Sequence, residues 1–168
     1  HTAPQELLYS RFYWYRSGVT DTMRRALADI TRAIEEMVVL KPRDVVLDIG
    51  ANDGTLLASY RHKGLRRVGC EPANNMIDLL KENADVVMHD FWDYGVYTSL
   101  GQKEGFEKAK VITAIGMFYD LEDPNQFIGD VQKALAEDGI FVAQLMCLTL
   151  MLEKNDIGNI CHEHLEYY

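Results

Sequence analysis

Cysteine is scarce in this sequence. Three cysteines, Cys70, Cys147 and Cys161, are spread over 168 residues, and no two of them form a Cys-x-x-Cys pair. This spacing predicts neither the disulfide framework of a small secreted domain nor a paired-cysteine zinc site. Isolated thiols are typical of a reducing compartment, so we expect a cytoplasmic location.

Long apolar runs are also missing. The longest candidate, residues 140–152, is interrupted by Gln144 and Thr149. It favours a buried strand that leads into a loop, whereas a membrane-spanning helix needs about 20 apolar residues. The first residues lack the basic segment and apolar segment that mark a secretory signal peptide. We therefore expect no membrane insertion and no secretion signal.

Positive charge is in deficit. The chain carries 17 Lys and Arg residues against 26 Asp and Glu residues, for a net charge of -9. Proteins that bind nucleic acids need a positive footprint for the phosphates, and anionic membrane surfaces attract basic segments. The charge balance therefore disfavours both as partners, although it identifies no partner of its own.

The hydrophobic pattern alternates between helical and strand periods. Met23, Leu27, Ile30, Ile34 and Met37 recur at spacings of three and four, which predicts an amphipathic helix that begins at residues 20–21. Residues 45–49 are apolar except for Asp48, as in a strand buried on both faces. Further strands are predicted over residues 67–71, 85–88, 110–114 and 139–145, and further helices over 55–62, 74–82 and 124–136.

This order of elements predicts an α/β fold. Strands that alternate with helices form βαβ units, so we expect a Rossmann-like, doubly wound, mainly parallel sheet with helices on both faces. The sequence shows no repeat or interdomain linker. We expect one domain, in which residues 1–40 form a helical segment that caps a pocket and residues 41–168 form the core.

Ligands of such sheets bind at the carboxyl ends of the strands. The first predicted strand runs into Asp48-Ile-Gly-Ala-Asn-Asp-Gly, in which Gly50 and Gly54 let a ligand approach the backbone and the next helix offers free N–H groups. The dinucleotide pattern G-x-G-x-x-G is absent, and Asp48 would sit badly against a pyrophosphate. A carboxylate there suits a cofactor with a cationic amino acid group and a sulfonium, which is S-adenosylmethionine.

Two further acids follow the next two predicted strands. Glu71 lies 21 residues past Gly50, where an acid accepts both ribose hydroxyls, although NAD sites use the same acid. Asp90 is placed to accept the exocyclic amine of an adenine while an apolar neighbour such as Phe91 packs on the base. Each acid also has a purely structural interpretation. Asp48 could be a turn or cap residue, Glu71 a surface acid and Asp90 the N-cap of the next helix.

The chain ends in a cluster of reactive side chains. Cys161, His162, Glu163 and His164 are consecutive, and each is able to bind a transition metal. The two histidines are only two apart, unlike those of the helical zinc motif H-E-x-x-H, and adjacent side chains point in different directions. We therefore expect no metal site. A proton-transfer role for His164 or Glu163 and a polar surface loop remain open.

Three segments of the chain resemble motifs of the class I S-adenosylmethionine-dependent methyltransferases. LDIGANDGTLL resembles the first motif, with Asn52 where the family often has glycine, GCEP the second, and HDF the adenine-contacting segment. The likeness extends over about residues 44–145 and implies S-adenosylmethionine as cofactor and S-adenosylhomocysteine as product. It implies cofactor contacts from Asp48, Gly50, Asn52, Gly54, Glu71, Pro72, Asp90, Phe91 and Ala114.

Residues 15–20 and 161–168 resemble a narrower group, the sugar C-methyltransferases that act on nucleotide-linked 4-keto deoxysugars. This resemblance implies His164 as the base, Glu163 as an orienting or sugar-binding group, and Tyr15 as a hydrogen-bond donor to the enolate oxygen. Cys161 stands where the group usually has tyrosine. The group's cysteine-rich zinc module, its C-terminal domain and the last two strands of the family's sheet are not found, so we expect a truncated core.

The expected function is methyl transfer from S-adenosylmethionine to a small molecule, with C-methylation of a nucleotide-linked keto-deoxysugar as the specific candidate. Transfer to oxygen or nitrogen of another small molecule remains open, because it would use the same cofactor residues. A non-catalytic cofactor-binding fragment also remains open. An NAD-dependent oxidoreductase is disfavoured by Asp48 and by the missing third glycine.

Overall fold

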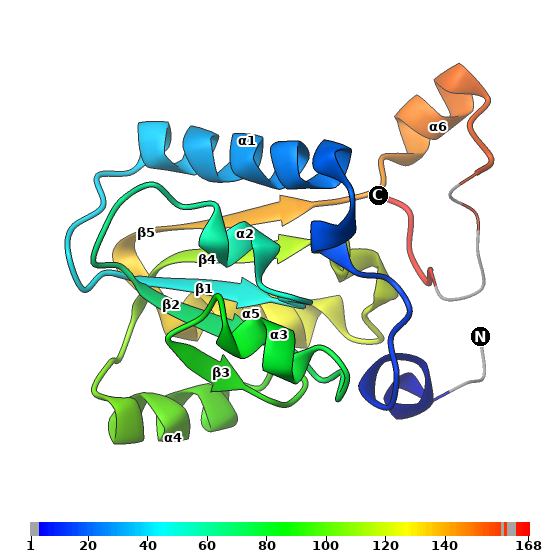
Figure 1. Ribbon diagram of the computed structural model, residues 1–168. Coiled ribbons are helices and arrows are strands. Elements are labelled where there is room, and N and C mark those ends of the chain that lie inside the picture. The colour runs from blue at the N-terminus through cyan, green and yellow to red at the C-terminus, as the bar shows by residue number, and fades with distance from the viewer. Residues whose placement is uncertain (1–3, 159, 161–163) are drawn as a thin grey trace.

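The computed structural model describes residues 4–158, 160 and 164–168. In this part of the chain a single five-stranded sheet has the strand order β3-β2-β1-β4-β5, and all four pairings are parallel. Figure 1 shows the strands running in one direction, with the ends of the described chain on the side toward which they point. The strands are β1 (Val45–Ile49), β2 (Arg66–Cys70), β3 (Val86–Met88), β4 (Ala109–Ile115) and β5 (Leu135–Gln144). The predicted α/β fold and parallel sheet are confirmed.

Helices connect the strands and extend the chain at both ends. The α-helices are α1 (Asp21–Met37), α2 (Thr55–Ala58), α3 (Ile77–Lys81), α4 (Tyr94–Glu104), α5 (Pro124–Ala134) and α6 (Leu148–Lys154). Shorter helical turns are η1 (Glu6–Ser10), η2 (Ser17–Val19) and η3 (Phe118–Asp120). Side-chain caps begin the longer helices: Thr20 accepts a hydrogen bond from the Met23 N–H, and Asp123 accepts one from the Gln126 N–H.

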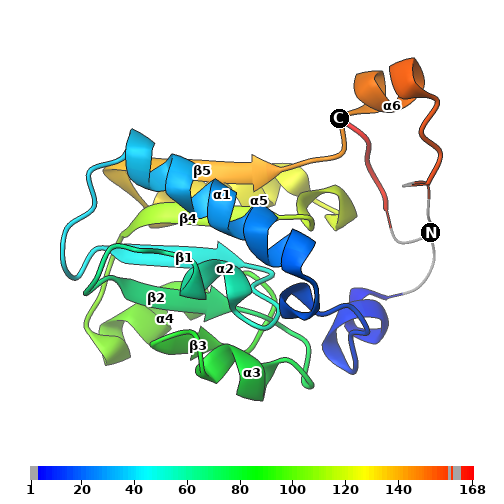
Figure 2. The same cartoon turned by 45° about the horizontal axis from the view of Figure 1, so that its top comes forward.

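The two faces of the sheet bury separate apolar cores. On one face, α1 and α2 pack on Val46 and Val111 through side chains such as Ile34. On the other face, α4 and α5 pack on Leu47 and on alternate residues of the neighbouring strands. Figure 2 shows α1 in front of the sheet and α5 behind it. Because successive strand residues point to opposite faces, one continuous apolar strand serves both cores.

The boundaries of several elements differ from the sequence prediction. The helices predicted over residues 55–62 and 74–82 are the shorter α2 and α3, and β5 begins directly after α5. Helix α4 was not predicted, because Gly95 and Gly101 weaken its helical pattern. Residues 148–154 form α6 where a loop was expected. Among the described residues no helix is long and apolar enough to cross a membrane.

Candidate active site

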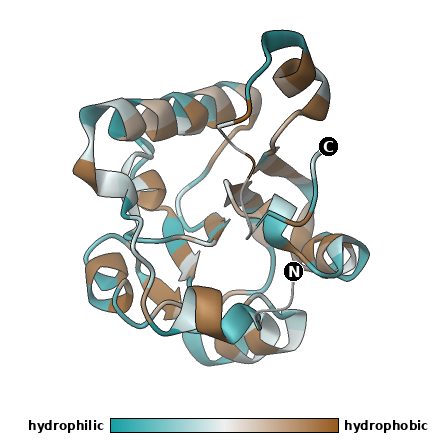
Figure 3. Cartoon of the chain, turned by 90° about the vertical axis from the view of Figure 1, so that its right-hand side faces the viewer, coloured by the Kyte–Doolittle hydropathy of each residue, from teal (hydrophilic) through white to brown (hydrophobic). Residues whose placement is uncertain are grey.

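A cavity of about 700 Å³ opens at the carboxyl ends of the strands. Figure 3 looks onto this side of the molecule, where the ends of the strands face the viewer and the C-terminal residues pass close to them. The cavity walls come from the N-terminal segment, from the residues that follow each strand, and from His164 near the end of the chain. The site therefore lies where the parallel sheet predicted it.

Asp48, at the end of β1, lines the cavity and is 4% exposed. Its Oδ1 accepts a hydrogen bond of 2.6 Å from the Thr113 hydroxyl on the neighbouring strand β4. Burial raises the pKa of Asp48 to about 7, the Thr113 hydrogen bond opposes this shift, and the nearby Glu71 carboxylate adds to it. A cationic ligand in the cavity would favour the ionised form of this carboxyl group.

The loop after β1 turns sharply beside the cavity. Gly50 has φ +74°, and a Cβ atom at this position would lie 3.1 Å from Cγ of Met117. Asn52 also adopts a left-handed conformation, with φ 51°, which asparagine tolerates better than most residues. Both residues line the cavity. Gly54 does not line it; it precedes α2, and a Cβ there would collide with Leu80 and Asn83.

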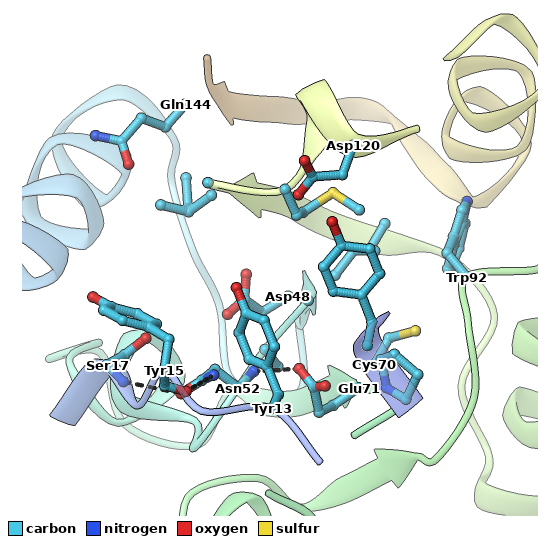
Figure 4. A pocket seen from close by; sticks show the side chains of 18 of the residues that line it. Tyr13, Tyr15, Ser17, Asp48, Asn52, Cys70, Glu71, Trp92, Asp120 and Gln144 are labelled. Carbon is cyan, nitrogen blue, oxygen red and sulfur yellow. Dashed lines mark hydrogen bonds between the residues drawn. The ribbon is translucent and has the colours of Figure 1, made fainter. Parts of the chain in front are cut away.

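Glu71 follows β2 and presents its carboxylate to the cavity, as Figure 4 shows. Oε2 accepts a hydrogen bond of 2.7 Å from the Asn52 N–H, and Oε1 accepts one of 2.8 Å from the Ala73 N–H. Burial raises the pKa of Glu71, and these two backbone hydrogen bonds oppose the shift. Each carboxylate oxygen has a second lone pair, so Glu71 retains the capacity to accept from a ligand. Pro72 lines the cavity beside it.

The segment after β3 contributes an aromatic ring to the cavity. Phe91 lines the cavity, and so does the adjacent Trp92. Asp90 is exposed and does not line it; its Oδ1 accepts a hydrogen bond of 2.8 Å from the following Phe91 N–H. Ala114 is fully buried within β4 and does not line the cavity either.

His164 and Tyr15, the two catalytic candidates among the described residues, both line this cavity. They are 149 positions apart along the chain. The His164 ring packs edge-on against the Tyr119 ring, with centroids 4.5 Å apart. The Tyr119 carbonyl accepts hydrogen bonds from the N–H groups of Leu165 and Glu166, at 2.9 and 3.1 Å. The predicted role of Glu163, with the neighbouring Cys161 and His162, lies outside the described residues.

The pKa of Tyr15 is raised by burial, and a hydrogen bond with Ser17 opposes the shift. A phenol with a raised pKa stays protonated at neutral pH, so it is able to donate a hydrogen bond. Tyr15 is 47% exposed and therefore remains accessible from the cavity mouth.

Sequence reasoning missed several residues of the site. Tyr9 and Tyr13 line the cavity from the N-terminal segment, and Asp120 lines it after β4. Gln144 ends β5 and also lines the cavity. The position of Gln144 at the end of a strand was a usable signal, because the same argument selected Asp48 and Glu71.

Among the described residues no three His, Cys, Asp or Glu side chains form a group that could hold a metal ion. The side chains that line the described site include carboxylates, phenols and one imidazole. These groups suit proton transfer and hydrogen bonding.

The fold and site match a known family. Residues 19–168 match the model described as "Methyltransferase domain", so the chain belongs to this methyltransferase family. Among curated proteins it is similar to the C-methyltransferase NovU of Streptomyces niveus, with 24% identity over 170 residues. That match covers 100% of this chain and 39% of the relative, so the chain spans well under half the length of NovU.

Solved structures share the fold at low sequence identity. A mycolic acid cyclopropane synthase complexed with S-adenosylhomocysteine is 18% identical, with a TM-score of 0.57, over 90% of this chain and 54% of that one. A coclaurine N-methyltransferase bound to N-methylheliamine and S-adenosylhomocysteine is 18% identical, with a TM-score of 0.54, over 83% of this chain and 40% of that one. These likenesses support the Rossmann-like core.

Proposed function

We propose that this chain binds S-adenosylmethionine and takes part in methyl transfer to a small molecule. The observation that carries the proposal is the position of Glu71, a buried carboxylate at the end of β2 that faces the same cavity as Gly50 and His164. An acid at this place suits a ribose diol, and the missing Cβ of Gly50 leaves room for a close approach of the ligand. The family match and the complexes of the similar folds with S-adenosylhomocysteine support the cofactor.

The residues of the cavity fit the parts of this cofactor. Glu71 would hold the ribose, Phe91 would pack on the adenine, and the carboxylate of Asp48 would face the cationic end. When bound, the cofactor supplies an electrophilic methyl group, and the electron pair of the broken carbon–sulfur bond stays with the sulfur. Asp90 and Ala114 do not line the cavity, so their predicted cofactor contacts stay predictions.

The specific reaction that we propose is C-methylation of a nucleotide-linked keto-deoxysugar. Carbon is a nucleophile only after loss of a proton next to the carbonyl, so the site needs a base and a donor to the enolate oxygen. His164 would take the proton, and the Tyr15 hydroxyl would donate a hydrogen bond to the oxygen. The name of NovU, a C-methyltransferase, supports carbon as the acceptor atom.

Two parts of the proposal rest on sequence alone, and a third also has support from the cavity lining. Glu163 would orient a ring or contact a sugar hydroxyl, as its resemblance to the sugar group implies. A cytoplasmic location follows from the isolated cysteines. Residues 1–40 would cap the site, which is supported by the cavity-lining side chains of Gln5, Tyr9 and Tyr13.

Calorimetric titration with S-adenosylmethionine, S-adenosylhomocysteine and NAD tests the cofactor. We expect binding of the first two and none of NAD; binding of NAD alone would overturn the proposal. Incubation with S-adenosylmethionine and a nucleotide-linked 4-keto-deoxysugar in D₂O then tests the reaction. A product with a new carbon–methyl bond supports C-methylation, whereas a new O–methyl or N–methyl bond would refute it and keep the cofactor assignment. Cofactor binding without turnover of any acceptor would favour a non-catalytic role.

A further inference from the structure

Residues 12–18, which we call the strap, carry two tyrosines to the cavity. Tyr13 and Tyr15 line the cavity, whereas Trp14 between them is 88% exposed. Over residues 13–15 this alternation is that of an extended chain, in which successive side chains point to opposite sides. Residues 12–16 belong to no strand, and Ser17 and Gly18 begin the helical turn η2, so no neighbouring strand holds the backbone of the strap. The groups that bind this backbone therefore contribute to the positions of both phenol rings, beside the contact of the Tyr13 ring with Tyr9.

Two asparagine side chains hold the strap, together with Asp53, whose Oδ2 accepts from the Gly18 N–H at 2.8 Å. Nδ2 of Asn52 donates to the Tyr15 carbonyl at 3.0 Å, and Oδ1 of Asn52 accepts from the Ser17 N–H at 2.9 Å. The Asn75 amide makes both of its hydrogen bonds with one residue of the strap. Nδ2 donates to the Tyr13 carbonyl at 2.9 Å, and Oδ1 accepts from the Tyr13 N–H at 2.9 Å. Each amide satisfies one backbone donor and one backbone acceptor, as a neighbouring strand would.

Asn52 also contacts the proposed cofactor site through its backbone. Its N–H donates the 2.7 Å hydrogen bond to Oε2 of Glu71, and the residue is only 6% exposed. Figure 4 shows Tyr15, Asn52 and Glu71 in a row along one wall of the cavity, joined by these hydrogen bonds. One residue therefore joins the acid proposed for the ribose to the strap that carries the phenols.

We propose that Asn52 is a positioning residue that couples cofactor binding at Glu71 to the placement of Tyr13 and Tyr15. This inference rests on the proposed function, because it takes Glu71 as the ribose acceptor. A ligand on the Glu71 carboxylate restrains the backbone of Asn52, and the Asn52 amide in turn restrains the strap. By thermodynamic linkage, a fixed strap strengthens cofactor binding by the same factor. The acceptor pocket is completed once the cofactor is in place.

Asn52→Gly separates the two contacts of this residue. Glycine adopts the left-handed conformation of position 52 without strain and keeps the N–H that Glu71 accepts. The substitution removes only the two side-chain hydrogen bonds to the strap. Asn155→Gly is the matched control, because Asn155 has φ 53° but lies exposed at the end of α6 and does not line the cavity.

The measurement is the hydrogen-exchange rate of the Tyr13 and Gly18 amides. NMR monitors this rate with and without saturating S-adenosylhomocysteine. The acceptors of the two amides, Asn75 and Asp53, are intact in both variants. Two hydrogen bonds of ordinary strength limit the change that Asn52 can make in the opening of the strap to about thirty-fold. Within this limit we expect the ligand to slow both amides about ten-fold in the wild type and in Asn155→Gly, and less than about two-fold in Asn52→Gly.

The possible outcomes separate the coupling from the cofactor assignment. A merely structural Asn52 would speed exchange equally with and without ligand, so undiminished protection in Asn52→Gly overturns the coupling. Binding of S-adenosylhomocysteine to the wild type without protection of either amide also overturns it and leaves the proposed function intact. Absence of binding to the wild type overturns both. Loss of protection in Asn52→Gly at saturating ligand, with calorimetric affinity lowered by about the same factor, confirms the coupling.

Discussion

The Thr113 hydroxyl donates a 2.6 Å hydrogen bond to the carboxylate of Asp48, from the neighbouring strand and 65 positions away in the chain. The pairing register places these two residues directly opposite each other. Both are buried. Burial disfavours the charged carboxylate and the hydroxyl partly compensates for it, so the two residues together set the charge at the floor of the cavity.

Asp48→Asn should make the stability of the protein less dependent on pH. The folded-state pKa of Asp48, about 7, exceeds its ordinary value of 3.8, so the folded protein binds the proton more tightly and gains stability at low pH. This contribution is lost as pH rises through about 7, and amounts to about 2.5 kcal/mol between pH 5 and pH 8. Urea unfolding of both proteins at these pH values measures it. If the stability of the two proteins varied with pH in parallel, the raised pKa of Asp48 would be contradicted. Glu71, whose pKa is also raised, is present in both proteins, so its contribution cancels in the comparison.

Thr113→Val should destabilise the protein more at high pH than at low pH. Valine fills the same space in β4 but removes the hydrogen bond that favours ionised Asp48. A hydrogen bond to a charged group contributes about 2 kcal/mol, so we expect a loss of this size near pH 8 and a smaller loss near pH 5. Urea unfolding at the two pH values is the measurement. A loss independent of pH would mean that Thr113 acts through packing or through its hydrogen bond to the Leu47 carbonyl, and not through the charge of Asp48.

Gly50→Ala should weaken cofactor binding, whereas Gly105→Ala should not. Both glycines have positive φ, 74° and 77°, so alanine strains the backbone at both and costs about 1 kcal/mol of stability. At Gly50 the new Cβ also lies 3.1 Å from Met117 beside the cavity, whereas at Gly105 nothing lies within 4 Å. Calorimetric titration with S-adenosylhomocysteine compares the two variants. Equal affinities would show that Gly50 is needed only for the turn.

Glu71→Gln should reduce the affinity for S-adenosylhomocysteine at least ten-fold. Each carboxylate oxygen of Glu71 accepts a hydrogen bond from a backbone N–H, and glutamine replaces one of these oxygens by an NH2 group, which donates and does not accept. Glu35→Gln is the control. Glu35 also accepts two backbone N–H bonds, from Arg61 and His62, but through one oxygen that glutamine retains, and it does not line the cavity. The titration should leave Glu35→Gln unchanged. Equal affinity of the two variants would remove Glu71 from the cofactor site.

His164→Asn should abolish methyl transfer and leave the binding of S-adenosylhomocysteine intact. The substitution removes the proposed base, and its loss costs on the order of 10²-fold or more in rate. His89→Asn, at an exposed position after β3, is the control and should stay active. Rates of product formation with a nucleotide-linked 4-keto-deoxysugar are the measurement. Full activity of His164→Asn would assign the base to another group.

Elements with a strong local hydrophobic pattern were predicted from the sequence, and elements with a weak pattern were not. Strand β1 was predicted at its observed bounds, because a continuous apolar run suits a central strand buried on both faces. Helix α4 has no comparable pattern. Its position depends on Tyr97, which is fully buried in the same apolar core as Leu47 of β1 and Ile112 of β4. Burial against strands that are distant in sequence is not encoded in the local periodicity of the helix.

The amino-acid sequence by itself determined the α/β class, the strand-end location of the site and the acids Asp48 and Glu71, because these follow from local periodicity and from the geometry of parallel sheets. Only the tertiary structure decided which candidates share the cavity. Gly54 packs against α3, Asp90 is exposed, and Ala114 is enclosed in β4. The same holds for Asn52, whose contacts with Glu71 and the strap join segments that are distant in sequence. Spacing along the chain cannot specify such contacts, because they depend on how the loops and the strap cross the end of the sheet.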